Sequence, residues 1–206
     1  LDRDSTFSPE DSVTSTAATY DDNQWHHVAC VKSSNTSLTL YVDGNSVGTP
    51  DSSLQSSGTY ANTDSLYLGI DGDGSSNGFE GFLDDFKIYR SALSPSQLKA
   101  DMNSKGSVRG AAAQLGQSDT SFLNDGLVGY WNMDETSWTN DCSTATVSDY
   151  SGNSFTGQSC PASSGPTTPL GGKFGNSGDF DGSNDYVSIA DTSELTPSTV
   201  MTISTW

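Results

Sequence analysis

The chain has 206 residues, of which 32% are hydrophobic and 21 are glycine, and eight Lys and Arg against 26 Asp and Glu give a formal net charge of −18. This charge repels nucleic-acid phosphates and anionic membrane surfaces, so neither is an expected partner. The apolar runs are far shorter than the roughly 20 residues that span a bilayer, and membrane insertion of this segment is not expected.

Both ends of the sequence indicate a piece of a longer polypeptide. Position 1 is Leu rather than Met, and the chain stops at Trp206 within the strand-like run Val-Met-Thr-Ile-Ser-Thr-Trp. We therefore expect an internal fragment.

Period-two patterns of β-branched and aromatic residues predict strands near 25–32, 36–43, 64–70 and 79–90. Asp43-Gly44 directly follows the second of these patterns. That pair tolerates the positive φ angles of a type I′ turn, so a tight hairpin is expected there.

The run 82–89 places a carboxylate in an apolar row. Strand alternation puts Phe82, Asp84, Phe86 and Ile88 on one face, and Asp85 is expected to point the other way, toward solvent. A buried, ionised Asp84 then needs a hydrogen bond, an ion pair or a bound cation.

A short helix is predicted near 95–102. Ser94 can act as its N-cap, Pro95 suits the first helical position, and Gln97 can close a capping box. From 106 to 125 the composition turns to Gly, Ala, Ser and Gln and indicates a linker. Strand patterns resume at 127–131, 178–189 and the terminal run, so the predicted fold class is all-β, an antiparallel β-sandwich of jelly-roll type.

Three cysteines are present. Cys142 and Cys160 lie in polar, Gly- and Ser-rich sequence and can close a local loop as a disulfide, which is typical of extracellular proteins, although spacing alone cannot fix the geometry. Cys30 lies in a strand pattern and is interpreted as a small buried apolar side chain.

Several linked motifs resemble one family. Trp25-His26-His27-Val28-Ala29, Leu40-Tyr41-Val42-Asp43-Gly44 and Gly81-Phe82-Leu83-Asp84-Asp85-Phe86 resemble the C-terminal half of a laminin-G-like, concanavalin A-like jelly-roll module. Leu127-Val128-Gly129-Tyr130-Trp131, Asp149-Tyr150-Ser151-Gly152-Asn153 and Phe180-Asp181-Gly182 resemble the N-terminal half of another copy.

This resemblance implies three segments: 1–105 as the C-terminal part of one jelly roll, 106–125 as a linker, and 126–206 as the N-terminal part of a second jelly roll. The two halves either dock as one permuted sandwich or remain separate half-sandwiches. Docking is favoured, because each half alone leaves an apolar face uncovered.

The resemblance also implies a structural calcium ion. Its side-chain ligands would be Asp84 and Asp149, with oxygens from Ser151, Gly152 or Asn153, a donor set that suits calcium. The alternative is that backbone amides or a lysine satisfy Asp84 and that Asp149 only caps a turn.

Catalysis is not expected. Glucanases of this fold use closely spaced acidic residues on a strand, and the pattern Glu-x-Asp-x-Glu is absent from the sequence. Sugar binding stays open, because Trp138, Tyr150 and Tyr60 fall in loop-like sequence where an aromatic ring can stack on a pyranose. Trp25 and Trp131 lie in strand patterns and are expected in the core.

The resemblance therefore implies a non-catalytic, calcium-stabilised carbohydrate-binding or adhesion module of a secreted or cell-surface protein. Its expected partners are a glycan or an extracellular protein ligand, and neighbouring laminin-G-like modules. The alternative is a structural spacer in a tandem array, or an appendage that targets an extracellular enzyme.

Overall fold

The computed structural model describes residues 13–15, 20–34, 37–52, 64–71, 77–104, 125–195 and 199–206. Its elements in chain order are β1 (Val28–Ser34), β2 (Ser37–Val42), β3 (Asn45–Asp51), β4 (Leu66–Leu68), β5 (Glu80–Leu83), β6 (Phe86–Tyr89), α1 (Pro95–Met102), β7 (Leu127–Trp131), β8 (Ala145–Val147), β9 (Gly157–Cys160), β10 (Leu170–Gly172), β11 (Gly175–Asn176), β12 (Gly178–Asp181), β13 (Tyr186–Ile189) and β14 (Met201–Thr205). The predicted all-β class with one short helix is confirmed.

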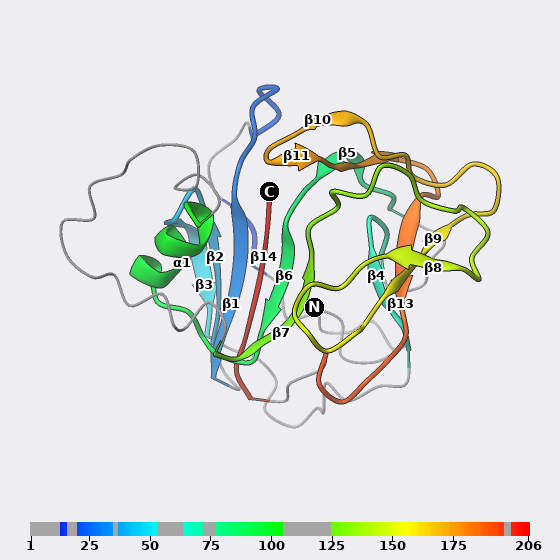
Figure 1. Ribbon diagram of the computed structural model, residues 1–206. Helices are drawn as coiled ribbons and strands as arrows, with labels where there is room; N and C mark the ends of the chain where they lie inside the picture. Colours follow the sequence, from blue (N-terminus) through cyan, green and yellow to red (C-terminus); the bar gives the residue numbers. More distant parts are fainter. Residues whose placement is uncertain are drawn as a thin grey trace.

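Two antiparallel sheets form the layers of the sandwich (Figure 1). One has six strands in the order β3-β2-β1-β14-β6-β7, and the other has four in the order β4-β13-β9-β8. The core between them includes Ile88, Trp131 and Met201 from the first sheet and Val147 and Val187 from the second. The remaining strands form two small two-stranded ribbons, β10-β11 and β12-β5.

Strands from both predicted halves of the chain pair with one another. β14 lies between β1 and β6, β7 pairs with β6, β12 pairs with β5, and β13 pairs with β4. Each of these pairings joins a strand before residue 105 to one after residue 125. The boundaries of the predicted linker stay a prediction, because 105–124 lie outside the described residues.

Local signals act as expected at the hairpin and at the helix. Asp43 and Gly44 have φ values of 49° and 71°, so the turn between β2 and β3 has the two positive φ angles of a type I′ turn. α1 begins after Ser94, which forms the predicted capping box with Gln97. No helix in the described part of the chain is long and apolar enough to cross a membrane.

The expected continuous strand over 79–90 is wrong. It is split into β5 and β6 at Asp84 and Asp85, and Asp85 takes a left-handed φ of 53°. Alternation therefore does not run through the break: Phe86 and Ile88 pack in or against the core, whereas Phe82 is 50% exposed. Asp85, expected in solvent, is only 2% exposed and accepts a hydrogen bond from the Tyr130 hydroxyl at 2.6 Å.

A buried polar network holds α1 on the outer face of the six-stranded sheet. Asp101 of α1 is 2% exposed, and its carboxylate accepts hydrogen bonds from Lys87 Nζ (2.8 Å), the Tyr89 hydroxyl (2.9 Å) and the Ser204 hydroxyl (2.8 Å). His27 Nε2 lies 3.7 Å from its second oxygen. Burial raises the pKa of Asp101, but the donors of His27, Lys87 and Ser204 outweigh it and bring the pKa well below its usual range.

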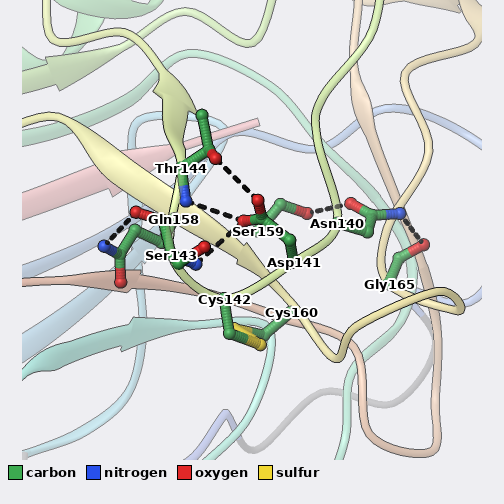
Figure 2. Close-up of a disulfide and its surroundings, with 9 residues drawn as sticks. All are labelled: Asn140, Asp141, Cys142, Ser143, Thr144, Gln158, Ser159, Cys160 and Gly165. Carbon is green, nitrogen blue, oxygen red and sulfur yellow. Dashed lines mark hydrogen bonds between the residues drawn. A yellow bond between two sulfur atoms is a disulfide. The ribbon is translucent and has the colours of Figure 1, made fainter.

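The predicted disulfide between Cys142 and Cys160 is present, with a Cα–Cα distance of 4.9 Å. It joins the segment before β8 to the end of β9 (Figure 2). Around it, the Ser159 hydroxyl donates to Asn140 Oδ1, and Asn140 Nδ2 donates to Gly165 O. The bond therefore closes a loop at one end of the four-stranded sheet. Cys30 is free and partly buried, and burial raises the pKa of its thiol.

Replacing Asp101 by Asn should destabilise the fold by about 3 kcal/mol, because Lys87 loses its charge partner while it stays buried. A carboxyl whose folded pKa is depressed stabilises the fold above its unfolded pKa of about 4, and this stabilisation fades as the pH falls toward the folded value. Urea unfolding of wild type and Asp101→Asn should therefore differ at neutral pH and converge in acid. Equal unfolding free energies at neutral pH would contradict the network's role, and exposed Asp125→Asn is the control.

Replacing both Cys142 and Cys160 by Ala should lower the free energy of unfolding by about 3 kcal/mol, the loss expected for a loop closed across 18 positions. The measurement is urea unfolding of the double variant beside the wild type. A reductant should reproduce the loss in wild type and leave the variant unchanged. If the reductant does not change the unfolding free energy of the wild type, and this free energy equals that of the double variant, the disulfide contributes nothing to stability.

Candidate functional site

The loop that follows β8 is organised by one carboxylate. Asp149 Oδ1 accepts hydrogen bonds from the backbone N–H groups of Tyr130 (3.0 Å) and Ser151 (2.8 Å), and Oδ2 accepts one from Phe155 N–H (2.9 Å). The Ser151 hydroxyl lies 2.8 Å from Oδ2. Three backbone donors from two segments therefore converge on Asp149, and they fix the loop against β7.

A second anchor holds the same loop. Asn153 Nδ2 donates to the carbonyl of Val128 at 2.8 Å, and the Ser151 hydroxyl lies 2.9 Å from that oxygen. Gly152 has a φ of 96°, a conformation that L side chains rarely adopt, and this turn carries the chain from Ser151 to Asn153. The loop is thus bound at both ends to the strand beside it.

Tyr150 is the exposed aromatic residue that this loop presents. Its side chain is 55% exposed, its N–H donates to Tyr130 O at 2.7 Å, and its ring meets the Tyr130 ring edge-on with centroids 6.3 Å apart. One edge of the Tyr150 ring is therefore supported, while more than half of the side chain faces solvent. Such a ring can stack on an apolar face of a ligand.

Tyr130 is itself held firmly. Its hydroxyl donates to Asp85, and Lys87 Nζ lies 5.2 Å from the centre of its ring. Burial, and next the nearby Asp85 carboxylate, raise the pKa of the Tyr130 hydroxyl, so it remains a protonated donor at neutral pH. Tyr150 thus rests on a neighbour that is fixed by a buried carboxylate.

The residues predicted to hold calcium do not fit the ion as they are placed. Asp84 is fully buried, and its Oδ2 accepts a hydrogen bond from Phe174 N–H at 2.8 Å. Asp149 already has three N–H groups and a hydroxyl directed at its two oxygens, and a cation would have to displace them. Within the described ranges, no group of three or more His, Cys, Asp or Glu side chains could hold a metal ion.

The predicted role of Trp138 as an exposed sugar platform is wrong. Its side chain is only 9% exposed and belongs to the core between the sheets, and its indole N–H donates to Glu135 Oε2 at 3.0 Å. The polar sequence around Trp138 indicated a loop, and that loop folds back over the core. Tyr60, the third predicted platform, lies outside the described residues.

One exposed aromatic pair was not predicted. Trp25 was expected in the core, but it is only partly buried and lies beside the exposed Phe82, with ring centroids 6.3 Å apart. Trp131, in contrast, is fully buried as expected. The sequence contains only a weak signal for this pair, which is that Asp85 is a residue type that tolerates left-handed backbone. A strand break at Asp85 interrupts the alternation, so Phe82 no longer has to lie on the same face as the buried Ile88.

Residues 3–99, just under half of the chain, match the laminin-G-like family model described as the concanavalin A-like lectin/glucanases superfamily. No curated protein and no solved structure gives a significant match. The superfamily description supports, at a coarse level, a carbohydrate-binding or adhesion-type module. Together with the antiparallel sandwich, the match shows that residues 3–99 belong to a laminin-G-like domain of the concanavalin A-like lectin/glucanases superfamily.

Proposed function

We propose that this chain is a non-catalytic carbohydrate-binding module that binds neutral glycans at the Tyr150 loop. The observation that carries the proposal is a half-exposed tyrosine ring on a loop that is locked by Asp149 and Asn153. A platform fixed before binding loses little conformational entropy when a sugar stacks on it. The superfamily match supports the same ligand class.

The charge of the protein favours neutral sugars over acidic ones. The formal net charge is −18, and Asp149 lies next to Tyr150 in the chain. An anionic glycan would be repelled by this negative charge during its approach. Neutral hexoses avoid this repulsion and still offer the apolar C–H face that an aromatic ring recognises.

The neighbouring acidic pair supports a non-catalytic role. Both oxygens of Glu135 are used within the fold, since they accept hydrogen bonds from the Trp138 indole and from Ser148 N–H. Asp134 Oδ1 accepts one from Asn176 N–H at 3.1 Å. These carboxylates hold loops together, and glycoside hydrolysis instead requires two that flank the scissile bond.

An extracellular location is part of the proposal. Laminin-G-like domains are typically extracellular, and the Cys142–Cys160 disulfide suits an oxidising compartment. Two alternatives predict no glycan binding by the isolated chain. In one, the module is a structural spacer in a tandem array. In the other, it is an appendage that targets an extracellular enzyme.

Replacing Tyr150 by Ala should weaken glycan binding about fivefold or more, because stacking of a sugar on an exposed ring contributes on the order of 1 kcal/mol or more. The measurement is a screen of neutral and acidic glycans on an array, followed by titration calorimetry with the best neutral ligand. Tyr150→Phe keeps the ring and should keep most of the affinity.

Tyr20→Ala is the matched control, since Tyr20 is also an exposed tyrosine but lies beside His26, away from the loop. It should bind like wild type. Binding by wild type that survives in Tyr150→Ala would move the site elsewhere, and silence toward every glycan would favour the spacer or adaptor role.

The calcium prediction is tested by the same protein without any glycan. Because Asp149 is occupied by backbone donors of β7 and of its own loop, we expect equal melting temperatures with excess calcium and with a chelator. A rise of several degrees in calcium that is lost in Asp84→Asn and in Asp149→Asn would instead establish the ion at the residues expected from the sequence. Thermal melts by circular dichroism distinguish the two results.

A further inference from the structure

The ribbon formed by β5 and β12 has two faces of different chemistry. Phe180 faces the core and is 1% exposed. Its neighbours in the alternation, Asp179 and Asp181, point the other way, and they lie directly opposite Phe82 and Glu80 of β5. Phe82, Glu80, Asp179 and Asp181 thus share the outer face of this ribbon.

Two aromatic rings meet on this outer face. Phe82 is half exposed, and the Trp25 ring lies against it at 6.3 Å with the planes inclined at 44°. Single exposed aromatic residues are common, but here an exposed ring has a second ring on one side and a carboxylate directly across the ribbon. We call Trp25, Phe82, Glu80, Asp179 and Asp181 the aromatic–acidic face.

The carboxylates of this face have no basic partner among the residues that the structure describes. In the ranges that the structure describes, none of Glu80, Asp179 and Asp181 forms an ion pair with Lys or Arg. The Asp179 carboxylate accepts a long hydrogen bond from the Thr167 hydroxyl at 3.5 Å. The Asp181 carboxylate accepts hydrogen bonds from N–H groups of its own turn. The negative charge is therefore left for a ligand to neutralise.

The negative charge of this face also affects the pKa of the neighbouring Asp185. Burial raises its pKa first, and the charges of Asp181 and Asp179 raise it further. The charges of this face therefore act on a buried carboxylate in the turn between β12 and β13, where Asp185 Oδ2 accepts a hydrogen bond from Asp181 N–H at 3.1 Å. In a protein with a net charge of −18, such a local field would attract cationic partners at long range.

We propose that the aromatic–acidic face binds an extended, lysine- or arginine-bearing segment of a partner protein. The alkyl stems of the basic side chains lie over Phe82 and Trp25, and their charged ends reach the carboxylates of β5 and β12. This site is separate from the Tyr150 loop and does not depend on glycan binding there.

The spacing of the face suits this ligand. The pair of Glu80 and Asp181 and the pair of Phe82 and Asp179 are two residues apart along the strands, which is roughly 7 Å. Side chains on one face of an extended peptide repeat at the same distance. A segment with basic residues at alternate positions therefore places one cation at each pair.

The probe is a fluorescently labelled peptide with alternating Lys and Ser, and its binding to the 206-residue chain is measured by fluorescence anisotropy. Phe82→Ala should weaken binding about tenfold, and Asp179→Asn with Asp181→Asn should weaken it to a similar degree. Glu80→Gln is a second charge variant that leaves the hydrogen bonds of the β12 turn intact. An alternating Glu and Ser peptide should not bind.

Asp125→Asn is the matched control, because it removes one exposed negative charge outside the face. It should bind like wild type. If Asp125→Asn and Glu80→Gln weaken binding equally, the peptide senses only net charge and the proposal is overturned. It is also overturned if Phe82→Ala binds like wild type, or if the face binds a neutral glycan through Phe82 and ignores the peptide.

Tyr150→Ala separates this proposal from the glycan site. It should leave peptide binding unchanged while it weakens glycan binding, and Phe82→Ala should do the reverse. Thermal melts confirm that each variant is folded, which is expected for Phe82→Ala because this ring lies on the outer face.

Discussion

The placement of β14 between β1 and β6 is the constraint on which the rest of the structure depends. Without this strand the six-stranded sheet would separate into β3-β2-β1 and β6-β7, and the facing backbone groups would lose their partners. Its side chains act on both faces. Met201 and Ile203 pack in the core, whereas the Ser204 hydroxyl donates to Asp101 beneath α1. The Thr202 hydroxyl accepts from Leu93 N–H and donates to Ser91 O, which fixes the segment that leads into the helix.

The end of β14 also accounts for the break between β5 and β6. Asp84 and Trp206 exchange backbone hydrogen bonds of 2.8 and 2.9 Å, and Asp85 then turns with a positive φ. β6 continues in the six-stranded sheet, while β5 leaves it to pair with β12. This one break shapes both surfaces: it directs the Asp85 carboxylate to Tyr130, which supports Tyr150, and it turns Phe82 outward beside Trp25.

The sequence predicts features whose cause is local and fails where long-range contacts decide. The Asp43-Gly44 turn and the capped helix depend on a few neighbouring residues, and both form as expected. The run 82–89 has the alternation of one strand, and its break depends on Trp206, a residue far away in the chain. The prediction that Trp138 is exposed fails for a related reason. Its polar neighbours indicate an exposed loop, but burying so large a ring in the core outweighs the local pattern.

The candidate site was predictable only in part, and its limits are also physical. Tyr150 was identified as an exposed ring, and it is exposed. The hydrogen bonds that Asp149 makes depend on how β7 lies against its loop, and sequence spacing does not reveal this. A carboxylate that organises a loop and one that binds a cation require the same residue type. They are distinguished by the donors that surround the oxygens, and at Asp149 these donors are backbone amides.

The two surfaces differ in the forces that they offer, and this difference has a consequence for adhesion. The Tyr150 platform presents a short-range stacking surface, whereas the aromatic–acidic face adds a field that acts over several ångströms before contact. Long-range attraction mainly raises the rate of association, and stacking mainly lowers the rate of dissociation. A glycosylated partner with a basic segment would engage both, and each weak contact would raise the effective concentration of the other ligand at its site. If both proposals hold, the chain would bind such a partner firmly while neither site is strong alone.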